Sequence, residues 1–105
     1  MEFLRKLFGI KPNPIIEILT DGASIIDVRT PFEYKSGHAA GAINIPLDQL
    51  QKMVNKIKQI KTPKVFYCAS GMRSATAVSI LKNNKIEDVY NAGSLHKVNR
   101  LIKAS

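Results

Sequence analysis

The stretch from Lys64 to Lys82, KVFYCASGMRSATAVSILK, decides the fold. It opens with Val65-Phe66-Tyr67, a short apolar run whose β-branched and aromatic residues are typical of a buried strand. It closes with Ser74 to Leu81, where small and apolar residues predict a buried helix. Between them, a short loop carries Cys68, the chain's only cysteine, from the end of the strand into the helix N-terminus. In open α/β sheets, this edge of the sheet is where ligands bind.

The loop that follows Cys68 has the properties that favour an anionic sulfur. The first amides of a helix have no partners within the helix, and the helix dipole adds positive potential there. Gly71 lets the backbone curl with unusual dihedral angles, and Arg73 adds a fixed positive charge. These surroundings lower the pKa of a thiol, so Cys68 is the candidate nucleophile, and the same amides can hold an oxyanion. The alternative is that a lone cysteine after an apolar strand is an inert small hydrophobe.

Two motifs resemble those of the rhodanese sulfurtransferases. One is the loop CASGMRS at positions 68–74; the other is DVRTPFEY at positions 27–34, followed by GHAAGAINIP at positions 37–46. They occur in the family's order, and the resemblance covers roughly residues 15–102. Rhodaneses commonly have a Gly-Gly pair and then a tryptophan near the C-terminal helix, whereas this chain has AGS at positions 92–94 and no tryptophan.

The resemblance implies a role for each matching residue. Cys68 would be the catalytic nucleophile, and Asp27, Arg29 and His38 would brace loops beside the site. We expect His38 to stay outside the chemistry, although a Cys-His pair is typical of thiol proteases. Arg73 would hold the oxyanion of the sulfur donor. The complete active-site and substrate-binding loop would be Ala69, Ser70, Gly71, Met72, Arg73 and Ser74.

The pattern along the chain predicts one α/β domain. Strands are expected at 23–28, 42–45, 65–67 and 86–90, with a turn at 91–93. Helices are expected after the cap at Asn13, at 32–34, at 47–61, at 74–81 and at 95–102. Alternating strands and helices give a parallel sheet with right-handed crossovers. The resemblance sharpens this to a single rhodanese-like domain, with a small, mostly parallel central sheet flanked by helices on both faces.

We assign residues 13–105 to this sulfurtransferase domain. Residues 1–12 are expected to form a short N-terminal amphipathic helix or extension, in which Phe3, Leu4, Leu7 and Phe8 would share one face. Packing across the edge of the domain is the favoured interpretation of that segment. A short anchor for a membrane or a partner is the alternative.

Composition narrows the class of partner. One cysteine and two histidines leave neither a disulfide nor a Cys-rich zinc site, and no metal or cofactor is implied. The net charge of +8 attracts small sulfur oxyanions and acidic proteins, but no basic run alternates with aromatic residues as a nucleic-acid site requires. With no membrane-length apolar run and no secretory signal, we expect a cytoplasmic monomer that binds neither nucleic acid nor membrane.

These observations predict a sulfurtransferase. Cys68 would take the outer sulfur of thiosulfate or a persulfide donor and, as a persulfide, pass it to cyanide, a thiol or a protein acceptor. A non-catalytic protein-binding or sulfur-carrier module is one alternative. A cysteine-dependent phosphatase or arsenate reductase is another, although those enzymes place five residues between Cys and Arg, and here there are four.

Overall fold

The computed structural model describes residues 13–105, and four parallel strands in the order β2-β1-β3-β4 form its sheet. The 1–12 helix or extension lies outside the described residues. The strands are β1 Ser24–Asp27, β2 Ile43–Asn44, β3 Lys64–Cys68 and β4 Val89–Ser94. The helices are α2 Pro14–Thr20, α3 Pro31–Lys35, the 3-10 helix η1 Leu47–Met53, α4 Val54–Lys58, α5 Met72–Asn83 and α6 Leu95–Ala104.

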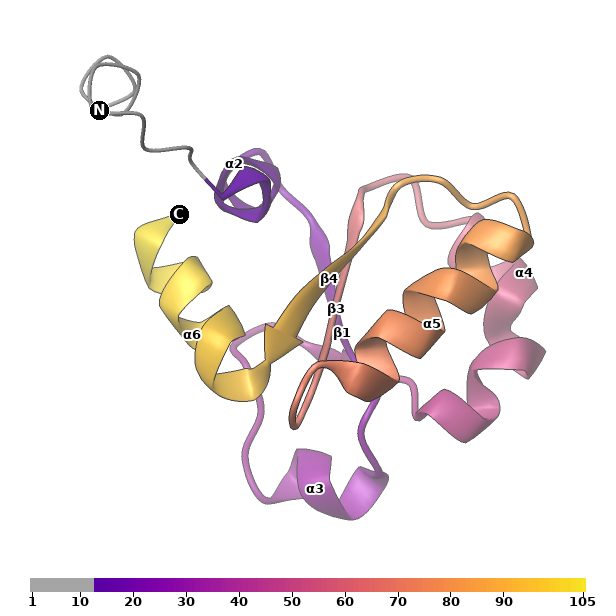
Figure 1. Ribbon diagram of the computed structural model, residues 1–105, viewed down its shortest axis with the longest axis horizontal. Coiled ribbons are helices and arrows are strands. Elements are labelled where there is room, and N and C mark those ends of the chain that lie inside the picture. Colours follow the sequence, from indigo (N-terminus) through magenta and orange to yellow (C-terminus); the bar gives the residue numbers. More distant parts are fainter. Residues whose placement is uncertain (1–12) are drawn as a thin grey trace.

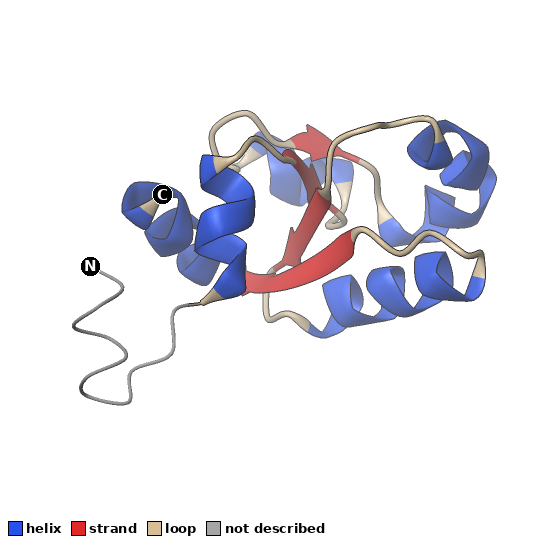
Figure 2. Ribbon diagram, turned by 90° about the horizontal axis from the view of Figure 1, so that it is seen from above, coloured by secondary structure: helices blue, strands red, loops and turns tan. Residues whose placement is uncertain are grey.

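Helices cover both faces of the sheet, as predicted (Figure 1, Figure 2). β3 lies between β1 and β4, and all five of its residues are buried. Its side chains alternate between the two faces, so Phe66 and Cys68 join one core while Val65 and Tyr67 join the other. The first core includes residues of α4 and α5, and the second includes residues of α2 and α6.

Capping side chains set the starts of three helices. Asn13 Oδ1 accepts a hydrogen bond from the Ile15 amide at 3.0 Å, which confirms the predicted start of α2. Thr30 and Glu33 form a reciprocal capping box at α3, and Ser94 accepts a bond from the Lys97 amide at α6. These caps give partners to amides in the first turn of each helix, which have none within the helix.

The predicted boundaries of the last strand were wrong. We expected a strand at 86–90 and a turn at 91–93, but β4 runs from Val89 to Ser94. β4 pairs with β3 through Asn91 opposite Phe66 and Gly93 opposite Tyr67, and Ala92 is the extra residue of a bulge. Ala92 is fully buried, so pairing and burial outweigh the turn-forming tendency of this segment.

The long helix predicted at 47–61 is divided into two helices. It begins as the 3-10 helix η1 and becomes the α-helix α4 only at Val54. Pro46 precedes the first turn, and no side chain caps it. Leu50, Val54 and Ile57, which repeat at intervals of three and four residues, are nevertheless all buried in the core.

The order of the strands places the site. The chain crosses from β1 outward to β2, then returns past β1 to β3, so connections leave β1 and β3 in opposite directions. Ligands of such sheets bind outside the carboxyl ends of the strands at this switch point. Cys68 is the last residue of β3 and therefore lies there. Within residues 13–105, no helix combines the length and apolar character needed to cross a membrane.

Candidate active site

The sulfur of Cys68 lies inside the turn that connects β3 to α5. The Gly71 amide donates a hydrogen bond to Cys68 Sγ at 3.0 Å, and the Ser74 hydroxyl lies 3.6 Å from the same sulfur. Gly71 has φ +99°, in the left-handed region, and this conformation turns its amide back toward the sulfur. The Cys68 side chain is buried, whereas Ala69 and Ser70 above it are exposed.

This environment lowers the pKa of the Cys68 thiol. Burial opposes the lowering, because it penalises the charged form. The amide and hydroxyl of Ser74 and the amides of Gly71 and Ser70 favour the anionic sulfur and outweigh that penalty. The site therefore favours a thiolate, as the loop sequence predicted.

Asn91, which lies in the β4 bulge, is a residue that the sequence interpretation missed. Its Oδ1 accepts hydrogen bonds from the Gly93 amide at 2.9 Å and the Ser74 hydroxyl at 2.6 Å, while its Nδ2 donates to the Gly71 carbonyl at 3.2 Å. Ser74 has one hydroxyl hydrogen and several acceptors within reach, so an anionic Cys68 sulfur competes for it with Asn91. Asn91 thus connects β4 to the catalytic loop.

Arg73 forms a bidentate ion pair with Glu33 of α3. Arg73 Nη1 and Nη2 lie 2.8 Å and 3.0 Å from the two carboxylate oxygens. The hydrogen bond from Arg73 is the main reason that the pKa of Glu33 is lowered to about 2. Glu33 raises the pKa of Arg73, and the nearby Cys68 adds to that effect. Arg73 therefore lies close to the sulfur with part of its charge balanced.

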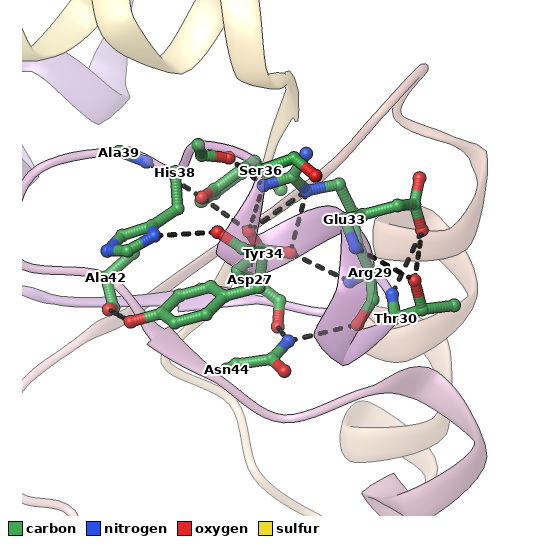
Figure 3. Close-up of polar contacts among 12 residues, drawn as sticks. Asp27, Arg29, Thr30, Glu33, Tyr34, Ser36, His38, Ala39, Ala42 and Asn44 are labelled. Atoms are coloured by element: carbon green, nitrogen blue, oxygen red, sulfur yellow. Dashed lines mark hydrogen bonds and ion pairs between the residues drawn. The ribbon is translucent and has the colours of Figure 1, made fainter.

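Asp27 and Arg29 form a buried network beside the loop (Figure 3). Arg29 donates to both carboxylate oxygens of Asp27 and, at 2.6 Å, to the Gly37 carbonyl. Asp27 also accepts a 2.6 Å hydrogen bond from the Tyr67 hydroxyl, which in turn accepts from the Ala39 amide. This network attaches the 37–39 loop to β1 and to β3, next to Cys68.

His38 lies apart from the sulfur contacts just described. Its ring stacks on Tyr34 with a centroid distance of 3.7 Å, and its Nδ1 lies 2.9 Å from the Tyr34 carbonyl oxygen (Figure 3). The residue is exposed. Among residues 13–105, no cluster of His, Cys, Asp and Glu side chains has the makeup to hold a metal ion.

A pocket of about 370 Å³ opens at the same edge of the sheet. Its wall comes from the end of β1, the start of α3, the start of η1 and one residue of α5. The lining residues are Val28, Thr30, Pro31, Pro46, Leu47, Asp48 and Arg73.

The four-stranded parallel sheet, with a thiolate-favouring turn at the end of β3, is the arrangement of a rhodanese-like fold. The Rhodanese-like domain family model matches residues 12–99, which is most of the chain. The chain belongs to the rhodanese-like domain family.

Sequence relatives and similar solved structures agree with this family assignment. The chain is 42% identical to the uncharacterized protein YqhL of Bacillus subtilis (strain 168) over 83 residues, covering 78% of this chain and 65% of YqhL. It is 38% identical to the thiosulfate sulfurtransferase PspE of Escherichia coli (strain K12), covering 70% of this chain and 71% of PspE. The solved structure of a rhodanese with anions from E. coli is 35% identical, with a TM-score of 0.67, covering 72% of this chain and 91% of that one. The family therefore includes sulfur-transferring enzymes.

Proposed function

We propose that this protein is a sulfurtransferase that carries sulfane sulfur as a persulfide on Cys68. The donor is thiosulfate or an organic persulfide, and the acceptor is cyanide, a small thiol or a protein thiol. The environment of the Cys68 sulfur supports this proposal most strongly. The sulfur accepts a hydrogen bond from the Gly71 amide at 3.0 Å, and the pKa of the thiol is lowered. The similarity to PspE supports the same reaction class.

The reaction has two halves. The Cys68 thiolate attacks the outer sulfur of thiosulfate, the bond between the two donor sulfurs breaks, and sulfite leaves with the electron pair. The resulting persulfide has its negative charge on the terminal sulfur. An acceptor then attacks that terminal sulfur, and the Cys68 thiolate is released. Amides directed at the turn stabilise the anion at each stage.

The loop around Cys68 binds the donor in this proposal. The positions are Ala69, Ser70, Gly71, Met72, Arg73 and Ser74, with Asp27, Arg29 and His38 as supporting residues. Because Cys68 is fully buried, a donor reaches the sulfur only after the loop or the Arg73 side chain moves. Since the chain has no second cysteine, the persulfide must pass to an external acceptor. We also propose that the protein works as a cytoplasmic monomer and that residues 13–105 are its catalytic domain.

Two alternatives make different predictions. A protein-binding or sulfur-carrier module would use the fold without turning over thiosulfate. A phosphatase or arsenate reductase would need amides that surround a tetrahedral oxyanion, whereas the turn here places the Gly71 amide on a single sulfur.

Mass spectrometry of the intact protein after thiosulfate treatment tests the proposal. We expect the mass to rise by one sulfur atom and to return to its starting value on addition of cyanide or a thiol. The Cys68→Ser variant is the matched control and should gain nothing, because its oxygen cannot carry a sulfane sulfur. A wild-type protein that gains no sulfur from thiosulfate or from an organic persulfide would refute the proposal.

A further inference from the structure

The pocket beside the Cys68 loop is mainly apolar, so thiosulfate would make few favourable contacts with its wall. Four of its seven lining side chains are the apolar residues Val28, Pro31, Pro46 and Leu47. Its volume of about 370 Å³ lies in the range that holds an organic ligand. Thiosulfate is a small dianion whose oxygens require hydrogen-bond donors, so it would leave the apolar wall unoccupied.

Strand register places this pocket next to the nucleophile. Asp27 pairs with Tyr67, and the Val28 amide donates to the Tyr67 carbonyl, so Val28 is the β1 neighbour of Cys68. Adjacent strands are about 4.8 Å apart. Val28 and Cys68 also point to the same face of the sheet, because both belong to one core. Arg73, five residues after the cysteine, also lines the pocket.

The charges around the pocket also favour an organic molecule over a dianion. Arg73 is the cationic member of the lining, and Glu33 holds two of its nitrogen atoms. Asp48 adds a carboxylate to the wall. Two exposed apolar side chains are sequence neighbours of lining residues. Phe32, which is 81% exposed, follows Pro31, and Met72, which is 77% exposed, precedes Arg73.

We propose that this pocket binds the apolar body of a small organic sulfur donor and thereby selects organic persulfides and thiosulfonates over thiosulfate. The inference rests on the proposed sulfurtransferase function and specifies its substrate class. With an organic persulfide, the Cys68 thiolate forms a bond to the terminal sulfur of R–S–SH, and the donor's S–S bond breaks. The proton stays on the transferred sulfur, and the thiolate R–S⁻ leaves with the electron pair.

Alkanethiosulfonates of increasing chain length test the apolar contact without changing the charge or the leaving chemistry. In this series the Cys68 thiolate takes the outer sulfur of R–SO₂–S⁻, and the sulfinate R–SO₂⁻ leaves. A fully buried methylene contributes about 0.8 kcal/mol, which is about fourfold in kcat/KM. From methane- to butanethiosulfonate we expect about two- to fourfold per added carbon, because the pocket is partly open to solvent. The reaction of a free thiol in solution should show no such rise.

The Leu47→Ser variant tests whether the pocket causes the rise. This variant removes an apolar side chain from the wall, so the dependence of kcat/KM on chain length should flatten. Leu47→Met should restore the dependence. Met53→Ser is the matched control, because Met53 lies on the same helix, is also partly buried and packs on the same core without lining the pocket.

A second readout needs no sulfur transfer. Alkanesulfonates lack the outer sulfur, and we expect them to protect Cys68 from iodoacetamide more strongly as the chain lengthens. Graded protection without persulfide formation would refute the sulfurtransferase and leave the pocket assignment standing. Persulfide formation with a flat series in both assays would refute the pocket assignment alone. If kcat/KM of Leu47→Ser rises with chain length as steeply as that of the wild type, the pocket assignment is also refuted.

Discussion

Replacing Gly71 by alanine should both destabilise the fold and disturb the turn around Cys68. A Cβ at this position would lie 3.2 Å from the Cα and 3.5 Å from the carbonyl carbon of Gly93. Gly22 has nearly the same φ, +98° against +99°, but nothing lies within 4 Å of the Cβ position there. Gly22→Ala therefore reports the conformational strain alone, which is about 1–2 kcal/mol for a left-handed residue.

Gly71→Ala adds a backbone collision to that strain. Overpacking of this kind costs about 1–3 kcal/mol, so we expect a total loss of about 2–5 kcal/mol in the free energy of unfolding. The collision also moves the Gly71 amide away from Cys68 Sγ, which it now meets at 3.0 Å. Losing a hydrogen bond to a charged group raises the thiol pKa and should lower the alkylation rate at neutral pH on the order of tenfold.

Two measurements separate these effects. Urea denaturation gives the free energy of unfolding of the wild type and of both variants, and the pH dependence of iodoacetamide alkylation gives the thiol pKa. The Gly22→Ala protein should keep the wild-type alkylation profile. If both variants lose the same stability and neither changes the profile, the loop is not held against the β4 bulge as described.

Two further predictions concern the residues that hold the loops. Glu33→Gln keeps the acceptor that caps α3 but loses the ion pair with Arg73, and should cost about 0.5–1 kcal/mol at pH 7, because the pair is partly exposed. The pKa of Glu33 is lowered from 4.5 to about 2, so the extra stability of the wild type over Glu33→Gln should be lost as the pH falls through that range. If the denaturation midpoints of the two proteins differ by the same amount at every pH, the ion pair is not the cause of the difference. Tyr67→Phe leaves a buried Asp27 oxygen without its 2.6 Å partner and should cost about 1–3 kcal/mol at pH 7. Burial, followed by Asp27, raises the pKa of Tyr67 from 10.0 to about 12, so the wild-type advantage should decline between those pH values; thermal denaturation of both proteins at pH 7 and pH 11 checks this.

The sequence allowed the central part of the site to be predicted because that part is local. A strand, a tight turn and a helix N-terminus follow one another within residues 64–83, so the sequence places the first amides of the helix beside Cys68. The short helix at 32–34 was predicted for the same reason, since the residues that cap it, Thr30 and Glu33, are only three positions apart.

The contacts that complete the site are long-range and were missed. Glu33 and Arg73 are 40 residues apart, and only the position of α3 relative to α5 brings them together. Asn91 was interpreted as a turn residue because Asn, Ala and Gly in sequence are typical of turns. Pairing with β3 overrides that local preference and places its side chain on Ser74.

The bulge in β4 has a consequence for protein synthesis. The Asn91 side chain accepts a hydrogen bond from the Ser74 hydroxyl and donates one to the Gly71 carbonyl. Both hydrogen bonds require β4 to be paired with β3. A nascent chain that has emerged from the ribosome only as far as α5 already contains Cys68 but has no strand to complete its turn. Its thiol would react with oxidants like that of any unfolded peptide, and the activated thiolate would form only after β4 had been translated. Translation order thus delays activation of the Cys68 thiol until the strand that completes its turn has been made.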